Sequence, residues 1–67
     1  MKIQYFQDTD TALIEFSKNV VSENREVSEN IYVDIGSKGN LVSMTIEHAK
    51  YTGALKSFSY EEIDKTA

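Results

Sequence analysis

Residues 31–46, IYVDIGSKGNLVSMTI, carry the strongest structural pattern in the chain. Apolar and polar side chains alternate in its first half, so Ile31, Val33 and Ile35 point to one side of an extended chain. Two glycines then fall within GSKGN, residues 36–40, and glycine adopts the positive φ of a tight turn at little steric cost. The stretch therefore predicts a β-hairpin. The inward residues expected in its second strand are Val42, Met44 and Ile46.

The N-terminal part of the chain repeats this pattern on either side of QDTD, residues 7–10. Period-two alternation over residues 2–6 and 12–16 predicts two further strands. Asp, Thr and amide side chains bond their own backbone and favour a turn, so these strands should form a hairpin. Residues 20–27 are expected to add another strand before the central hairpin.

The C-terminal part lacks strand alternation and carries a helix signal. Ser59 followed by Glu62 is a capping box, and Phe58 with Ile63 forms the matching hydrophobic staple. These two signals predict a short helix over about residues 60–65. The segment should pack on the apolar side of the sheet. Its expected contacts are Tyr51, Leu55, Phe58 and Ile63 with Ile14, Val33 and Met44.

The fold class expected from these patterns is α+β, mainly β. We expect a small antiparallel β-meander of four to five strands over residues 1–46 and a helical C-terminal segment over residues 47–67, in a single domain. A chain of 67 residues without cysteine has a thin core and no disulfide staple. Extra stability must then come from good packing or association, which predicts a homo-oligomer, most simply a homodimer.

Charge narrows the classes of partner. The formal net charge is −4, and the seven Lys and Arg residues are scattered singly, so phosphate backbones should repel the chain. We expect no direct nucleic-acid binding and consider a basic protein the plausible partner. No stretch is apolar enough to span a membrane or form the core of a secretion signal. A cytoplasmic protein is expected.

Several segments together resemble a family of short bacterial proteins of unknown function. The matching segments are MKIQY, EVSENIYVD and GNLVSMTIEHA, together with Asp10 and Ile14. Phe6 and Gln7 depart from the family pattern, and the residues beyond Tyr51 have no counterpart in it. The resemblance implies a small β-meander without established biochemistry, and some relatives are associated with small toxin-like proteins.

Two sets of residues are candidates for a catalytic or metal-binding site. Asp8 and Asp10 supply two carboxylates, but a divalent cation needs more converging oxygen ligands, so a hairpin corner held by Asx-type bonds is the favoured interpretation. His48 is the only histidine and lacks a recognisable nucleophile motif, which favours a surface or capping role. We therefore expect no catalytic residues, bound metal or cofactor.

The candidate binding site lies instead on the side of the sheet opposite the core. By alternation, Leu13, Tyr32 and Leu41 should share that side, and an apolar patch rimmed by charge is typical of an interface. The rim residues are Glu15 and Asp34. The sequence thus favours a non-catalytic protein-interaction module, antitoxin-like in binding a basic protein. A small enzyme and a homodimeric small-ligand-binding protein remain the alternatives, the latter with a pocket between sheet and tail.

Overall fold

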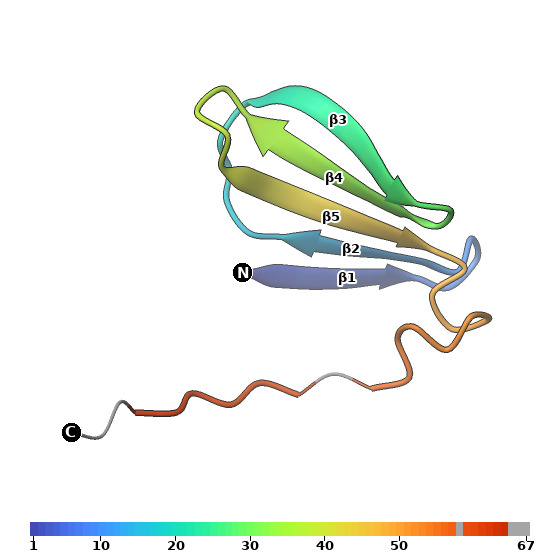
Figure 1. The fold of residues 1–67 in the computed structure, drawn as a ribbon. Helices are drawn as coiled ribbons and strands as arrows, with labels where there is room; N and C mark the ends of the chain where they lie inside the picture. The colour runs from blue at the N-terminus through green and yellow to red at the C-terminus, as the bar shows by residue number, and fades with distance from the viewer. Residues whose placement is uncertain (58, 65–67) are drawn as a thin grey trace.

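The protein forms one five-stranded antiparallel sheet (Figure 1). A computed structural model describes residues 1–57 and 59–64. The strands are β1 (Lys2–Phe6), β2 (Thr11–Glu15), β3 (Val21–Ser28), β4 (Ile31–Gly36) and β5 (Leu41–Glu47). The sheet confirms the prediction of a mainly β protein built from antiparallel strands.

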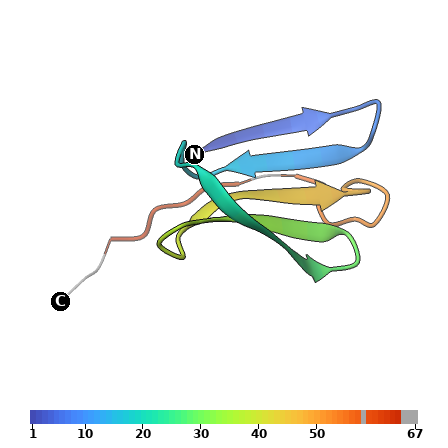
Figure 2. The same cartoon turned by 90° about the horizontal axis from the view of Figure 1, so that it is seen from above.

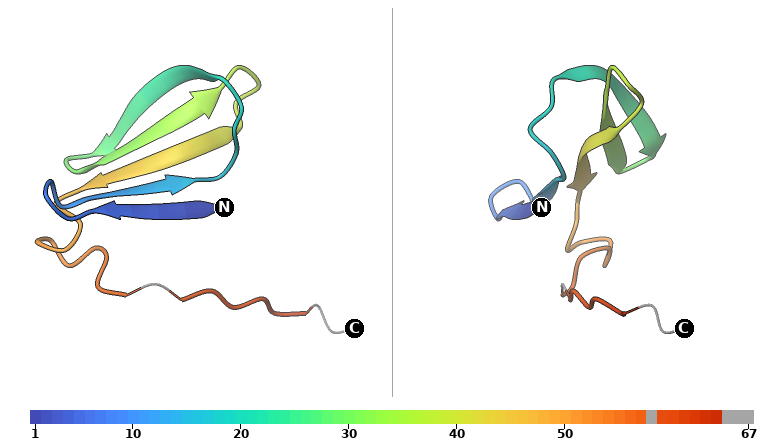
Figure 3. Two further views of the ribbon diagram at one scale, coloured as in Figure 1. Left: turned by 180° about the vertical axis from the view of Figure 1, so that it is seen from behind. Right: turned by 90° about the vertical axis from the view of Figure 1, so that its left-hand side faces the viewer.

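The strands do not lie in the sheet in the order of the chain. Their spatial order is β1-β2-β5-β4-β3, so β5 pairs with both β2 and β4. Strands β3, β4 and β5 form a meander, whereas the link from β2 to β3 passes the ends of β5 and β4 (Figure 3). Seen from above, the strand directions rotate from β1 to β3, which is the normal twist of a sheet (Figure 2).

The central hairpin forms where the glycines predict it. Gly39 has a φ of 81°, and its N–H donates to the carbonyl of Gly36 at 3.0 Å. The N–H of Gly36 in turn donates to the carbonyl of Asn40 at 2.8 Å. A side chain at position 39 would be strained at this φ, so glycine is the residue that fits the turn.

The pairing register separates the side chains into two faces, because cross-strand partners point to the same side. The apolar face comprises Ile3, Tyr5, Ala12, Ile14, Ile31, Val33, Ile35, Leu41, Met44 and Ile46, with Glu23 and Arg25 at the β3 edge. The polar face comprises Lys2, Gln4, Leu13, Glu15, Asn24, Glu26, Tyr32, Asp34, Ser43, Thr45 and Glu47. The two faces match the alternation of the sequence except where the register shifts, twice in β3 and once at the β5 bulge described below.

The buried cluster of the apolar face is confined to one end of that face. Ala12 and Ala49 are fully buried and Ile46 is 9% exposed, and Leu55 packs against this cluster. Within residues 1–57 and 59–64, no large side chain is fully buried. The sheet is thus a single layer with a small cover rather than one wall of a closed core.

The predicted C-terminal helix is wrong for the residues that can be assessed. Residues 48–53 form turns, and residues 59–64 contain no helix. Ile63 is 80% exposed, so it forms no staple against the sheet, while Phe58 and Lys65 lie outside the described residues. A six-residue helix offsets its nucleation cost only by packing, and residues 59–64 are all exposed.

The predicted packing of the C-terminal segment holds for Leu55 and fails for Tyr51. Leu55 contacts the buried cluster, whereas Tyr51 is 87% exposed. In the part of the chain that the structure describes, no helix is long and apolar enough to cross a membrane.

Candidate functional site

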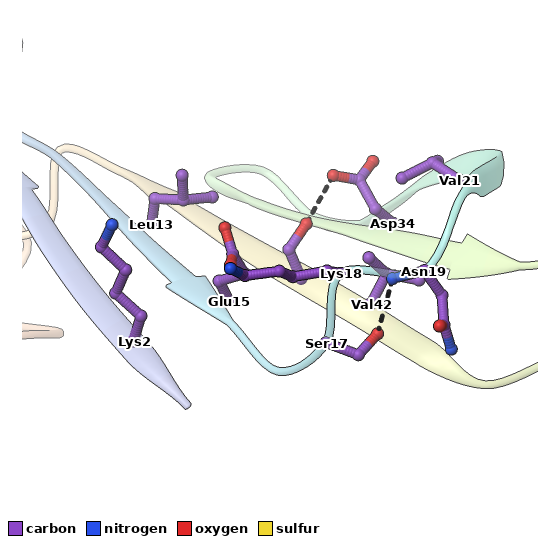
Figure 4. A pocket seen from close by; sticks show the side chains of 10 residues that line it. Lys2, Leu13, Glu15, Ser17, Lys18, Asn19, Val21, Asp34 and Val42 are labelled. Atoms are coloured by element: carbon purple, nitrogen blue, oxygen red, sulfur yellow. Dashed lines mark hydrogen bonds between the residues drawn. The ribbon is translucent and has the colours of Figure 1, made fainter.

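A groove lies on the polar face, where the link from β2 to β3 passes the sheet (Figure 4). Its volume is about 540 Å³. The lining residues are Lys2, Leu13, Glu15, Ser17, Lys18, Asn19, Val21, Asp34, Val42 and Ser43. The groove therefore brings together three of the residues singled out from sequence: Leu13, Glu15 and Asp34.

Asp34 is held by two hydrogen bonds on this face. Its Oδ2 accepts from the Ser43 hydroxyl at 2.6 Å, and its Oδ1 accepts from the Asn24 amide at 2.8 Å. The Ser43 bond, followed by the Asn24 bond, lowers the pKa of the Asp34 carboxyl below its usual value. A carboxylate stabilised in its charged form is a weak proton acceptor at neutral pH, so Asp34 suits a fixed negative charge better than a general base.

Tyr32 lies in the next row of the same face. The register places it beside Thr45, which in turn pairs with Leu13, and opposite Glu26 on β3. The negative charges of Glu47 and then Glu26 raise the pKa of the Tyr32 hydroxyl. The aromatic ring thus stands among carboxylates, although Tyr32 does not itself line the groove.

Leu41 is not on this face, contrary to the prediction. The register moves from Asp34–Ser43 to Ile35–Leu41, which leaves Val42 as an extra residue in a β-bulge. Leu41 consequently pairs with Ile35 and joins the apolar face. Strict alternation predicts neither the bulge at Val42 nor the position of Leu41 on the apolar face, because a bulge inserts one residue without altering the composition of the strand.

Val42 is the groove residue that sequence reasoning assigned to the wrong side. It was expected inward with Met44, yet it lines the groove and is only 4% exposed. Its carbonyl accepts the N–H of Phe16 at 2.8 Å and that of Ser17 at 3.2 Å. The bulge therefore anchors the start of the link that closes the groove, and no local signal in the sequence marks it.

The acidic turn between β1 and β2 has a structural role through Asp10. Its Oδ1 accepts the Tyr5 hydroxyl at 2.6 Å and the Lys50 N–H at 2.9 Å, and its Oδ2 accepts the Tyr51 N–H at 3.1 Å. The Tyr5 bond, followed by the Lys50 bond, lowers the pKa of Asp10. Asp10 thus holds the segment after β5 against the first hairpin, while Asp8 is exposed on the same turn.

His48 is placed in the turn that follows β5. Its φ is 54°, and its Nδ1 lies 3.1 Å from Oδ1 of Asn30. Its carbonyl accepts both the N–H and the hydroxyl of Thr52, at 2.9 and 2.8 Å. These contacts form a local turn rather than a nucleophile and base pair. Among residues 1–57 and 59–64, no three His, Asp or Glu side chains gather as metal ligands.

These features define a small single-sheet β protein with an acidic, grooved face and an opposite apolar face. The chain belongs to a family described as "Protein of unknown function (DUF2283)", whose model matches residues 2–50. The match confirms the resemblance to a family of unknown function. It spans all five strands and ends at Lys50, whose N–H binds Asp10. No curated protein and no solved structure matches the chain.

Proposed function

We propose that this protein is a non-catalytic protein-interaction module that binds a basic protein through its polar face. The observation that carries the proposal is the position of Tyr32 between Glu26 and Glu47, in the same cross-strand row as Leu13. A half-buried aromatic ring among carboxylates suits a Lys or Arg side chain, since the ring attracts a cation and the carboxylates pair with it.

The charges of the whole chain support the same kind of partner. A net charge of −4 steers a basic protein toward the molecule, and the steering weakens as salt screens it. Glu15 and Asp34 extend the negative charge of Glu26 and Glu47 across the sheet. An antitoxin-like role, in which the acidic face masks a basic protein, fits this arrangement. A cytoplasmic location belongs to the same proposal.

The groove favours a second candidate, the binding of a small ligand. A volume of about 540 Å³ lies within the range of natural ligand sites. Asp34 and Ser43 are hydrogen-bonded to each other. The polar groups that a ligand in the groove would contact are therefore the Glu15 carboxylate and the ammonium groups of Lys2 and Lys18. A pocket between sheet and tail also exists, about 280 Å³ in volume and lined in part by Tyr5 and Leu55.

Affinity capture from the native host, followed by reconstitution with the purified captured protein, tests the first candidate. Tyr32→Ala should weaken the reconstituted complex by about 2 kcal/mol, roughly thirtyfold in Kd, because aromatic anchors dominate interface energetics. Tyr60→Ala is the matched control, since Tyr60 is 69% exposed on the segment beyond the sheet. Association should also slow as salt rises.

An unchanged affinity in Tyr32→Ala would remove the polar face from the proposal. Turnover of any substrate by the purified chain, abolished by Asp10→Ala or His48→Ala, would overturn the non-catalytic assignment. Stabilisation by a small molecule that is lost in Glu15→Gln and kept in Tyr32→Ala would favour the groove ligand instead.

A further inference from the structure

The apolar face is largely uncovered. Ala49 and Leu55 cover the end that contains Ala12 and Ile46. The next row across the sheet runs from Ile3 through Ile14 and Met44 to Val33, and each of these side chains is only half-buried. We propose that a second copy of this chain covers the row, so that two sheets pack face to face around a two-fold axis.

The surface area of the isolated chain supports a missing layer. Its accessible surface is 5450 Å². A compact monomer of this mass exposes about 4,300 Å², so the excess is roughly 1,100 Å². Each partner of a standard stable interface buries about 800 Å². The exposed residues 59–64 account for part of the excess, and the uncovered row of the sheet accounts for another part.

The charges on the two faces favour a second copy of the chain, rather than a basic protein, as the molecule that covers the apolar face. Four carboxylates lie on the polar face, so two polar faces of identical chains would repel each other. On the apolar face the charged side chains of the sheet are Glu23 and Arg25 on β3, which bond to each other at 2.9 Å. Lys50, whose Nζ lies 4.6 Å from the centre of the Tyr5 ring, and Lys56 add positive charge beside Tyr5 at one edge of this face. The face therefore carries no net negative charge, and an identical acidic chain can approach it without carboxylates repelling each other.

The position of Met44 makes it the central contact of such a dimer. It lies in the middle of β5, the central strand, and its cross-strand neighbours are Ile14 and Val33. Facing sheets pack about 10 Å apart, with side chains interdigitating. Met side chains adapt to irregular gaps, which suits a residue on or near a two-fold axis. The chain's own C-terminal segment is the competing occupant, but Ile63 is 80% exposed.

Isotope-filtered NMR on the unaltered chain tests the proposal. Equal amounts of ¹³C,¹⁵N-labelled and unlabelled protein are mixed, unfolded, refolded together and examined for intermolecular NOEs. We expect such NOEs at the methyl groups of Met44 and Val33 and none at the methyl groups of Leu13 and Thr45 on the opposite face. A monomer at NMR concentration, or NOEs at Leu13 and Thr45 or along strand edges alone, would overturn it.

A pair of neighbouring substitutions gives an independent test. Met44→Glu places a charge in the proposed interface and should raise the dimer dissociation constant by about a hundredfold or more. Thr45→Glu, one residue away on the opposite face, should change it by less than about threefold. Light scattering coupled to gel filtration measures both, and the NMR experiment decides the matter if Met44→Glu does not fold. Wild-type dimerisation of Met44→Glu would contradict the proposal.

The dimer does not depend on the proposed recognition of a basic protein. Tyr32→Ala tests the polar face and should leave the dimer intact, whereas Met44→Glu tests the apolar face. Failure of one proposal is therefore distinguishable from failure of the other.

Discussion

Four hydrogen bonds converge on Asp10, one from β1 and three from the segment after β5. It joins Tyr5 of β1 to the backbone of Lys50 and Tyr51, which lie 40 and 41 residues further along the chain. Its backbone carbonyl also accepts the Ala49 N–H at 2.9 Å. A φ of 54° is unusual for a residue other than glycine, although Asp tolerates it better than most. Through these bonds, Asp10 holds the segment after β5 over the small buried cluster.

Asp10→Asn should lower Tm at neutral pH and make the backbone amides of Lys50 and Tyr51 exchange faster with deuterium. Hydrogen bonds lower the pKa of Asp10 in the folded chain below its ordinary value of about 3.9. The resulting stabilisation is fully present above that value and is lost as the pH falls through the lower, folded pKa. The Tm difference between wild type and Asp10→Asn should therefore shrink below about pH 4.

Asp8→Asn is the control for this prediction, because Asp8 is exposed on the same turn. Its Tm should match that of the wild type at every pH. A Tm difference for Asp10→Asn that stays constant from pH 7 to pH 2 would contradict the role assigned to the Asp10 charge.

At the scale of elements, the segment after β5 divides into a packed part and an exposed part. The Leu55 N–H donates to the Ala49 carbonyl at 2.9 Å, and the Leu55 side chain contacts the buried cluster. Residues 59–64 are exposed throughout. The segment therefore contributes to stability up to Leu55, whereas the exposed side chain of Ile63 contributes little.

Leu55→Ala should lower the free energy of unfolding by about 1 to 2 kcal/mol, less than a fully buried leucine would cost, because Leu55 is half-buried. Ile63→Ala is the matched control and should change it by less than about 0.5 kcal/mol. Urea denaturation followed by circular dichroism measures both. Equal losses for the two variants would mean that residues 59–64 pack against the sheet after all.

The β3 edge strand shows how the sheet limits its own exposure. All eight of its residues are exposed, and its register shifts twice, at Val21–Glu23 and at Glu26–Ser28. Bulges and charged side chains such as Arg25 make an edge a poor template for another strand. This arrangement favours association through a face of the sheet over association through this edge.

At the scale of the whole molecule, the chain is less compact than its length allows. Its radius of gyration is 13.7 Å. A compact domain of 67 residues has a radius of gyration of about 11 Å. A single layer of sheet with an extended segment accounts for the difference. The proposed dimer would add a second layer and turn the half-buried row of the apolar face into a shared core.

Dimerisation linked to folding predicts that Tm rises with protein concentration. Each tenfold increase in protein concentration stabilises the dimer relative to two unfolded chains by about 1.4 kcal/mol. For two chains of this length, that corresponds to a rise in Tm of roughly 5 °C. Differential scanning calorimetry over two decades of concentration measures the slope. Thr45→Glu should keep the slope and Met44→Glu should lose it. A wild-type Tm independent of concentration would contradict a dimer that forms on folding.

The features that depend on near neighbours in the chain could be predicted from the sequence. Alternation with period two revealed the strands, and the glycines of GSKGN revealed the central hairpin, because both signals act within a few residues. The position of the acidic turn between β1 and β2 was also correctly predicted, but the Asp10 carboxylate bonds to Tyr5, Lys50 and Tyr51 rather than in the expected Asx-type pattern. Three of the five candidate interface residues, Leu13, Glu15 and Asp34, do line one groove.

The features that depend on residues far apart in the chain could not be predicted, because they arise from strand pairing and packing. The bulge at Val42 moves Leu41 to the apolar face, and β5 inserts between β2 and β4. The bonds from Asp10 to Lys50 and Tyr51 likewise have no local signal. The capping box at Ser59 was a real local signal, but residues 59–64 find no surface to pack on, and a helix of that length is unstable alone. Local patterns set which strands and turns can form, whereas register and packing set which side chains meet.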